Sequence, residues 1–519
     1  MRVAVASILL GTVAAPGAGA QAPAPSPLRA PLRASNEVPL TFADSALVGR
    51  ILLAEDRRDS LDASIAAGMR HADDRLRTLT RRALGRIRDP RFAMRDSLPP
   101  LAAPPVWPEA DWRLRYRALA AARTDCKALL ASMRDANTHV RLRAIDLAGA
   151  PAAANAATAL PPCMDDRAVI AELMRVIDTT EATWHAAAHA TVSLARLSGV
   201  DAQARIHRVA RHLRWQPRQY AARAALILAD TALLHTFTRD SHDNVRETAI
   251  ESLSSLVGHA ADATYMEALG STGAQVVRAA AAALKGSTRA DMPAAALRAF
   301  ERLVANANAS EHDARVALLE AAGKTADDDR PPPVRVSLPA DAVALALGAD
   351  IRLRVTMAPT SGGGAFTVRL RGDVAPMMAA RMLALTREGY FDRRDWHRVE
   401  ADFVAQGLSP GSNEYVGYRD FLRDELGTVP HVRGTLGMST RGHDTGDAQW
   451  FINVRDNLRL NRDYSVWAEV VDGMGVVDAI LEGDIVERVS VVLVSGASST
   501  DAGRIQHAGR PQHIRHTAF

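Results

Sequence analysis

An arginine, a glutamine and several apolar residues lie close together in the C-terminal third of this 519-residue chain. Arg398 and Gln406 flank Phe403 in the run WHRVEADFVAQG, and Phe451 and Leu460 follow within WFINVRDNLRL. A charged side chain is costly to bury without a partner, so an arginine among such residues needs a reason to be there. Arg398 is therefore the first candidate for a functional residue in this part of the chain.

Four runs in this part of the chain resemble motifs of the cyclophilin family of peptidyl-prolyl cis-trans isomerases. They stand in the family's order and read FDRRDWHRVEADFVAQG, GTLGMST, DAQWFINVRDN and LNRDYSVWAEVVDGM. The resemblance covers about residues 365–492, roughly a quarter of the chain. It implies a closed antiparallel β-barrel with two covering helices, and an enzyme that isomerises X-Pro bonds in proline-containing polypeptides.

The chemistry of that reaction matches the residue types. Rotating a peptide bond costs about 18–20 kcal/mol because amide resonance is lost in the twisted state. Uncatalysed exchange at X-Pro bonds takes on the order of tens to hundreds of seconds. An enzyme needs an apolar pocket for the proline ring and donors that favour the twisted amide. The reaction requires no nucleophile, metal or cofactor, and none is predicted.

The resemblance also implies roles for individual residues. Arg398 would be the catalytic donor, supported by Gln406 and by Phe451 of the proline pocket. The other predicted substrate-binding residues complete the pocket or contact the peptide backbone, and they are Phe403, Val404, Ser439, Thr440, Gln449, Leu460 and Tyr464. Both glutamines would orient the arginine and the bound peptide.

Three positions depart from the family pattern. Val404 stands where methionine is usual, Leu408 replaces the second glycine of a pair, and Arg459 replaces an aromatic residue at the pocket rim. These departures keep an alternative open, in which the domain is a scaffold or chaperone that binds proline-containing segments without catalysis.

Local patterns predict the elements that position these residues. Residues 350–358 and 365–372 alternate apolar and polar side chains, which predicts two strands, and the glycines at 362–364 predict a loop between them. Residues 375–388 then predict a helix ended by Gly389. We expect the isomerase domain to span 346–495.

The preceding part of the chain is predicted to be helical from 42 to 324. An aliphatic residue, an arginine and an alanine-rich run return at spacings near 32–37 residues, as in DNVRETAIESLSSLVG and AQVVRAAAAALKG. This period indicates an α-solenoid of paired helices, and the phrase resembles HEAT repeats. Such a domain could bind clients or a protein partner. A proline-rich linker at 325–345 would separate it from the isomerase domain.

The beginning of the chain predicts export. Arg2, an apolar run and Ala18-Gly19-Ala20 have the layout of a signal peptide at 1–20, followed by a Pro/Ala-rich leader at 21–41. We therefore expect a periplasmic or extracellular protein without a membrane span in its mature form. A polar tail is expected at 496–519.

Charge and cysteine content add further limits. The chain has 63 basic and 59 acidic residues, well mixed, so nucleic-acid binding is not predicted. Cys126 and Cys163 could form a disulfide or remain two buried thiols. His185 and His189 have a spacing that can bind zinc, but no third ligand is evident, so we predict ordinary histidines on the surface of the helical domain.

Overall fold

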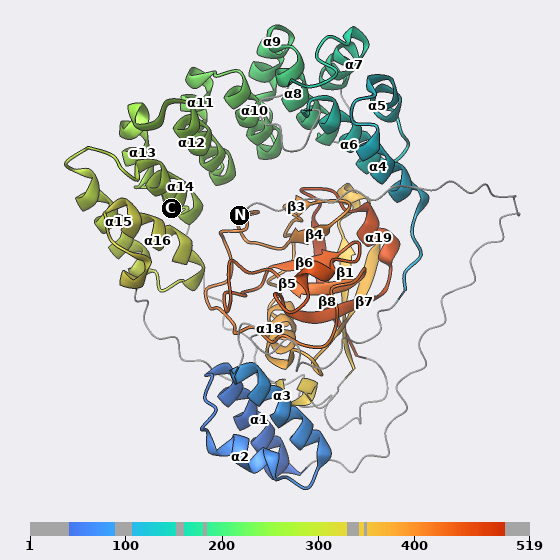
Figure 1. The fold of residues 1–519 in the computed structure, drawn as a ribbon, viewed down its shortest axis with the longest axis vertical. Helices are drawn as coiled ribbons and strands as arrows, with labels where there is room; N and C mark the ends of the chain where they lie inside the picture. Colours follow the sequence, from blue (N-terminus) through green and yellow to red (C-terminus); the bar gives the residue numbers. More distant parts are fainter. Residues whose placement is uncertain are drawn as a thin grey trace, which may run out of the picture. The chain divides into compact units, whose positions relative to one another are not determined.

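The computed structural model describes residues 41–88, 106–151, 160–179, 184–329, 342–346 and 350–493. Helices form the part of the chain before the first strand, and strands dominate after it (Figure 1). The described residues from Phe42 onward belong to a single unit by their contacts. The predicted signal peptide, the leader up to residue 40, the centre of the linker and the tail lie outside the described residues.

The helices before the sheet form two packed groups. In the first group the members pack on one another, and they are α1 (Phe42–Asp56), α2 (Ala63–Met69) and α3 (Asp74–Arg88). The second group consists of α4 (Asp111–Ala121), α5 (Cys126–Ser132), α6 (Thr138–Ala148), α7 (Arg167–Asp178), α8 (His185–Leu197), α9 (Gly199–Val209), α10 (Trp215–Ile227), α11 (Thr231–Phe237), α12 (Asp243–Val257), α13 (Asp262–Ala268), α14 (Ala274–Leu284), α15 (Met292–Ala305) and α16 (His312–Ala321).

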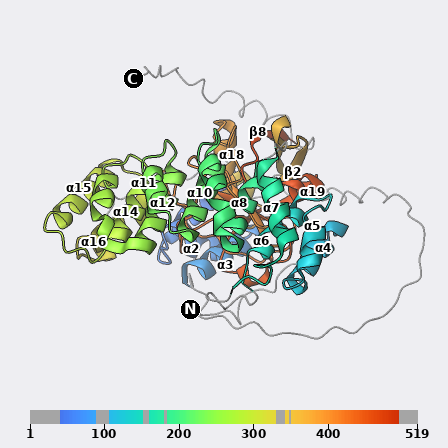
Figure 2. The same ribbon diagram turned by 90° about the horizontal axis from the view of Figure 1, so that it is seen from above.

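From α5 onward, consecutive helices of the second group pack in pairs. The second helix of each pair also packs against the second helix of the next, from α6 through α8, α10, α12 and α14 to α16 (Figure 2). Apolar side chains repeat along one face of these helices, as Val245, Ala249 and Leu253 do in α12, where all three are fully buried. The result is a helical region of the kind that repeats build.

A disulfide joins the first two pairs of this region. Cys126, at the start of α5, is bonded to Cys163, which precedes α7, and their Cα atoms are 5.6 Å apart. The sequence left a disulfide and free thiols as alternatives, and the structure contains the disulfide. The bond closes a loop with a sequence separation of 37 residues.

Eight strands form one curled antiparallel sheet in the order β3-β4-β6-β5-β7-β2-β1-β8. They are β1 (Ile351–Met357), β2 (Ala365–Leu370), β3 (Arg398–Val399), β4 (Val404–Gly407), β5 (Thr435–Met438), β6 (Trp450–Asn453), β7 (Val466–Asp472) and β8 (Val486–Leu493). The first two confirm the strands predicted at 350–358 and 365–372. The segment before β3 contacts the beginning of β8 at the other end of the strand order. There the amides of Arg393 and Trp396 donate to the carbonyls of Val486 and Asp484, at 2.8 and 2.9 Å.

Two helices pack on this sheet. Helix α18 (Pro376–Arg387) confirms the helix predicted at 375–388 and packs against β7 and β8, while α19 (Met474–Ala479) packs against β2. Buried Trp396, Trp450 and Trp467 are the largest side chains of the core around the sheet. A short helix, α17 (Ala342–Ala346), lies at the end of the predicted linker and packs against α1 and α18.

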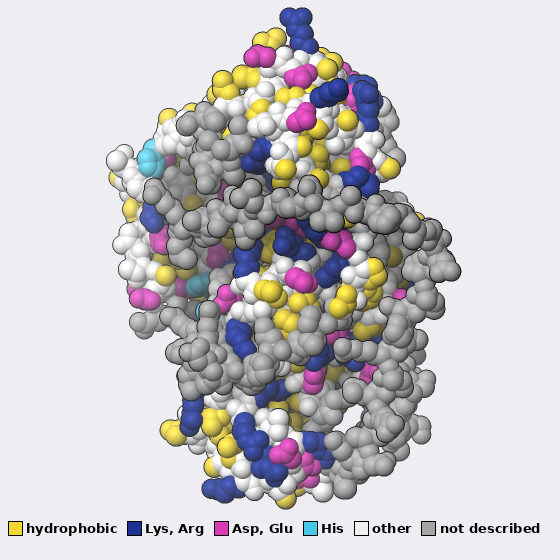
Figure 3. All heavy atoms as spheres, turned by 45° about the vertical axis from the view of Figure 1, so that its right-hand side comes forward, with side chains coloured by type: hydrophobic (Ala, Val, Ile, Leu, Met, Phe, Trp, Pro, Cys, Tyr) yellow, Lys and Arg dark blue, Asp and Glu magenta, His cyan; other side chains and the backbone are white. Residues whose placement is uncertain are grey.

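Charged side chains of both signs are interspersed on the face drawn in Figure 3, over helices and sheet alike. Within the described ranges, no helix combines the length and the apolar character that crossing a membrane would need.

Removing the disulfide should destabilise the helical region. Closing a loop of 37 residues restricts the unfolded chain, which is worth about 3–4 kcal/mol in the free energy of unfolding. We expect Cys126→Ala with Cys163→Ala to lower the unfolding midpoint in a denaturant titration. Reductant should lower the wild-type midpoint as well and leave the double variant unchanged. Equal midpoints for wild type with and without reductant would contradict the prediction.

Candidate active site

A row of cross-strand partners runs through four neighbouring strands and contains the predicted catalytic residues. Arg398 of β3 is paired with Gln406 of β4, Gln406 with Phe451 of β6, and Phe451 with Gly437 of β5. Residues directly opposite one another in a sheet have their side chains on the same face. The strand register therefore brings together the three residues predicted to be catalytic, the outer two of which are 53 positions apart along the chain.

Hydrogen bonds fix the direction of Arg398. Its Nη1 donates to Oε1 of Gln406 at 3.0 Å, and its Nη2 pairs with the carboxylate of Glu400. The amide nitrogen of Gln406, which is buried, donates to Oγ of Ser439 at 2.9 Å. The Arg398 side chain is 43% exposed, so its guanidinium can reach a bound peptide. Gln406 thus holds the Arg398 guanidinium, and Ser439 holds the Gln406 amide.

An apolar cluster lies beside this arginine. Val404, Phe451 and Leu460 are buried in contact with one another, and Phe403 and Tyr464 pack against them while partly exposed. The rings of Phe451 and Tyr464 meet edge to face, with centroids 5.6 Å apart. All five were predicted to line the pocket, and the structure brings them together. They form an apolar surface of the kind that a pyrrolidine ring can bury.

Of the remaining predicted residues, two lie beside the site and one faces a neighbouring loop. Ser439 and Thr440 follow β5 and are half-buried. The structure does not place the Gln449 side chain on Arg398, because its amide donates to the carbonyls of Glu414 and Val416, both at 3.1 Å. Gln449 therefore holds the loop that contains these two residues.

Two of the departures from the family pattern have visible consequences. The guanidinium of Arg459 lies 4.5 Å from the centre of the Phe403 ring, so a cation–π contact stands at the pocket rim. Leu408 has a φ of 71°, a left-handed conformation that favours glycine. Its side chain is fully buried, and that burial offsets the backbone strain.

His431 is part of the pocket's support, although the sequence did not point to it. Its ring stacks on Phe451 with centroids 5.6 Å apart. Nε2 lies 3.0 Å from the Tyr464 carbonyl and Nδ1 lies 3.1 Å from the Asn453 amide nitrogen, so the neutral ring donates from Nε2 and accepts at Nδ1. Burial lowers the pKa of His431 to about 4. A neutral, fixed imidazole therefore backs the ring that the substrate would touch.

The prediction that His185 and His189 lie on a surface is wrong for His185, whereas His189 is partly exposed. His185 is buried, and its Nε2 contacts the carbonyl of Glu482 at 2.6 Å. His189 contacts Asp146 at 2.8 Å and the hydroxyl of Tyr220 at 3.0 Å. Segment 481–484, between α19 and β8, covers this part of the helical region. Among the described residues, no group of three or more His, Cys, Asp or Glu side chains could hold a metal ion.

Comparison with known proteins agrees with the geometry. The family described as cyclophilin type peptidyl-prolyl cis-trans isomerase/CLD matches residues 354–498. A peptidyl-prolyl cis-trans isomerase of Helicobacter pylori strain J99 is 32% identical over 130 residues, which are 24% of this chain and 80% of that protein. Peptidyl-prolyl cis-trans isomerase B of Escherichia coli K12 is 35% identical over 128 residues, covering 22% of this chain and 78% of that protein.

A third relative, peptidyl-prolyl cis-trans isomerase B of Bacillus subtilis strain 168, is 30% identical over 131 residues, covering 25% of this chain and 92% of that protein. The chain therefore belongs to the cyclophilin-type peptidyl-prolyl cis-trans isomerase family. Its enzymatic class is that of a peptidyl-prolyl cis-trans isomerase, carried by the sheet region.

Gly437 leaves room for the ring of Phe451, and filling that space should damage the site. A Cβ atom at Gly437 would lie 2.1 Å from the nearest ring atom, and Phe451 is buried. We expect Gly437→Ala to displace the ring and to lower kcat/KM on a proline peptide by about tenfold or more. The matched control is Gly475→Ala in α19, where nothing lies within 4 Å of the added carbon. Equal activities of the two variants would contradict the assignment of Phe451 to the active site.

Buried His431 should make the folded protein sensitive to mild acid. Its pKa is about 4 in the folded protein and rises to its ordinary value near 6.5 on unfolding, so the unfolded chain binds more protons between these values. Stability contributed by the neutral ring is therefore full above pH 6.5 and declines as pH falls toward 4. His139, His185 and His397 have lowered pKa values through burial as well.

The measurement is the free energy of unfolding as a function of pH. We expect His431→Gln to reduce the slope between pH 6.5 and 4 by about 1 kcal/mol per pH unit relative to wild type. His212→Gln, which changes an exposed ring, should keep the wild-type slope. A wild-type slope in His431→Gln would show that His431 is not neutral in the folded state.

Proposed function

We propose that this chain isomerises X-Pro bonds of exported proteins, with the proline ring on the cluster of Val404, Phe451 and Leu460 and with Arg398 as the donor. The observation that carries the proposal is the fixed position of the Arg398 guanidinium, half-exposed beside that cluster and hydrogen-bonded to Gln406. An apolar pocket together with one oriented donor is what the reaction needs.

The physical basis is a difference in binding between two states of the amide. In the planar state, resonance spreads the nitrogen lone pair over the carbonyl. In the twisted state the lone pair is localised on nitrogen, and the nitrogen becomes a better hydrogen-bond acceptor. Arg398 donates more strongly to that state and so lowers the barrier, because only interactions that are stronger in the transition state raise the rate. The pocket holds the ring while the preceding residue rotates.

The Arg398 guanidinium has an acidic partner, Glu400, but this ion pair is open to water. Glu400 pairs with one side of the guanidinium, and both side chains are near half exposure, so the pair is weakened by water. A bound peptide can therefore take over donors from Glu400 at little cost. Gln406, in contrast, is buried, and its hydrogen bond keeps the Arg398 side chain beside Gln406 and Phe451.

The wider role proposed here includes export and the helical region. The apolar run that precedes Ala18-Gly19-Ala20 supports a periplasmic or extracellular location. The paired helices support a HEAT-like solenoid that binds clients or a partner, and the strand order supports a closed barrel. Some residues of the helices are already engaged, because Asn244 and Glu247 of α12 hydrogen-bond to the loop at 411–413. A client would therefore bind through other residues.

Substitution of Arg398 tests the catalytic assignment. We expect Arg398→Ala to lower kcat/KM in a proline-isomerisation assay by about 100-fold, because an oriented donor is lost from the transition state. The pocket stays, so binding of a proline-containing peptide should change little. Arg387→Ala, at the end of α18, is a control arginine of the same domain. Wild-type activity in Arg398→Ala would exclude catalysis through this donor. If the wild-type protein bound the peptide and showed no isomerase activity, the scaffold alternative would be supported.

A further inference from the structure

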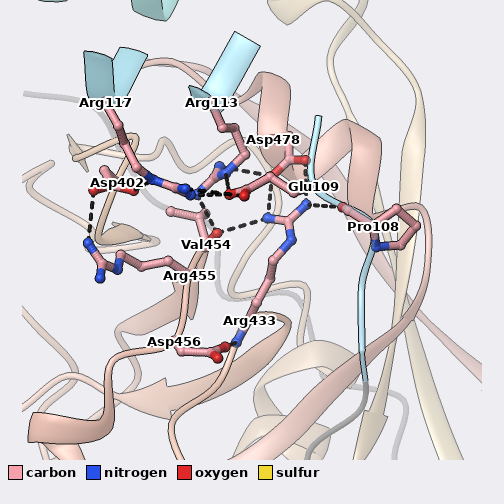
Figure 4. A network of polar contacts seen from close by, with 10 residues as sticks. All are labelled: Pro108, Glu109, Arg113, Arg117, Asp402, Arg433, Val454, Arg455, Asp456 and Asp478. Atoms are coloured by element: carbon pink, nitrogen blue, oxygen red, sulfur yellow. Dashed lines mark hydrogen bonds and ion pairs between the residues drawn. The ribbon is translucent and has the colours of Figure 1, made fainter. Parts of the chain in front are cut away.

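Helix α4 directs two arginines toward Asp402 and Val454 of the sheet region (Figure 4). Arg113 and Arg117 are four residues apart and share one face of the helix, whereas Arg115 lies on the opposite face. The side chain of Arg113 is only 2% exposed. The helix lies outside residues 354–498, the part of the chain that matches the isomerase family, so these contacts are additional to the family's own domain.

Arg117 contacts the turn that joins β3 to β4. Its Nε donates to Oδ1 of Asp402 at 2.9 Å, near the tip of the turn. Within the turn, the amide of Phe403 donates to the carbonyl of Glu400 at 2.8 Å. The turn therefore links Arg398, the proposed donor, to Phe403, a wall of the proline pocket. An ion pair to Asp402 holds this link from outside the sheet.

Arg113 contacts the end of β6, which contains Phe451. Its Nη2 donates to the carbonyl of Val454, and that oxygen also accepts from Nη1 of Arg433 at 2.8 Å. Asp478 pairs with both arginines, at 3.4 Å from Arg113 and 2.6 Å from Arg433. The amide of Val454 donates to the carbonyl of Phe403 at 3.3 Å, so the end of β6 and the β3–β4 turn are joined.

We propose that α4 is a positioning element of the isomerase pocket, acting through Arg117 on the β3–β4 turn and through Arg113 on the end of β6. The proposal rests on the proposed role of Arg398 and of the apolar cluster. Donor and ring pocket stand on these two segments, and catalysis depends on their separation, because a shift of about 1 Å can lower a rate severely. The helical region therefore acts on the reaction by holding the two segments in place.

The two arginines differ in what their removal would do. Arg113 is buried, so its loss would remove packing as well as a hydrogen bond and would destabilise the protein around α4. Arg117 and Asp402 are 37% and 24% exposed, and ion pairs at such positions add little to stability. Asp402 also pairs with Arg455, at 2.9 Å, so removing Arg117 should loosen the turn without freeing it, while the protein stays folded. Arg117 is the better residue for a test.

The test uses the full-length protein and a matched pair of variants. We expect Arg117→Ala to lower kcat on a proline peptide by about two- to fivefold, with KM and the unfolding temperature nearly unchanged. Arg115→Ala removes an arginine of the same helix that pairs with Asp135 of the helical region, and it should keep wild-type kcat. Arg117→Lys should recover part of the loss, because a cation can still reach Asp402. Equal kcat values for Arg117→Ala and Arg115→Ala would overturn the proposal.

Amide hydrogen exchange provides a readout that does not depend on activity. The amide of Phe403 is bonded within the turn, and the amide of Val454 is bonded to the carbonyl of Phe403. In Arg117→Ala both amides should exchange about two- to fivefold faster than in wild type. They should keep wild-type rates in Arg115→Ala. Unchanged exchange in Arg117→Ala would also overturn the proposal. If Arg398→Ala kept full activity, the catalytic assignment would fall, while the exchange rates would still decide whether α4 positions the turn.

Discussion

The register between four strands sets the geometry of the active site. Opposite residues in a sheet share a face, so the pairs from Arg398 through Gln406 and Phe451 to Gly437 place a donor, an orienting amide, a ring and a space for that ring in one line. A slip of one residue in any of these pairings would turn the side chains of that strand to the other face. The apolar cluster and the hydrogen bonds of Arg398 both depend on this alignment.

Features that arise from nearby residues could be predicted from the sequence. Alternation of side chains located β1 and β2, and the apolar pattern that ends at Gly389 located α18 within one or two residues. The pocket residues could be predicted because they fall in runs whose order resembles a known family. For Arg398, Phe403 and Phe451 the structure adds the contacts that the resemblance implied but could not show.

Features that arise from contacts between distant segments could not be predicted. His431 is an isolated histidine in its local sequence, and its place behind Phe451 follows from the packing of three separate segments. Gly437 gives no signal of its own until the ring of Phe451 is placed against it. The burial of His185 was missed for the same reason, because the segment that covers it lies about 300 residues further along the chain.

Most polar contacts between the sheet region and the second group of helices come from loops, and Asp478 of α19 adds contacts to Arg113 and His139. Asp402, the loop at 411–419, Arg441 and Glu482 all lie between strands, while the strand row itself is left to the isomerase site. The catalytic strands can therefore retain the sequence of a free-standing isomerase while the loops adapt to a neighbouring domain. Joining the two regions would then require changes in the loops and in α19, while the strands that form the active site could stay unchanged.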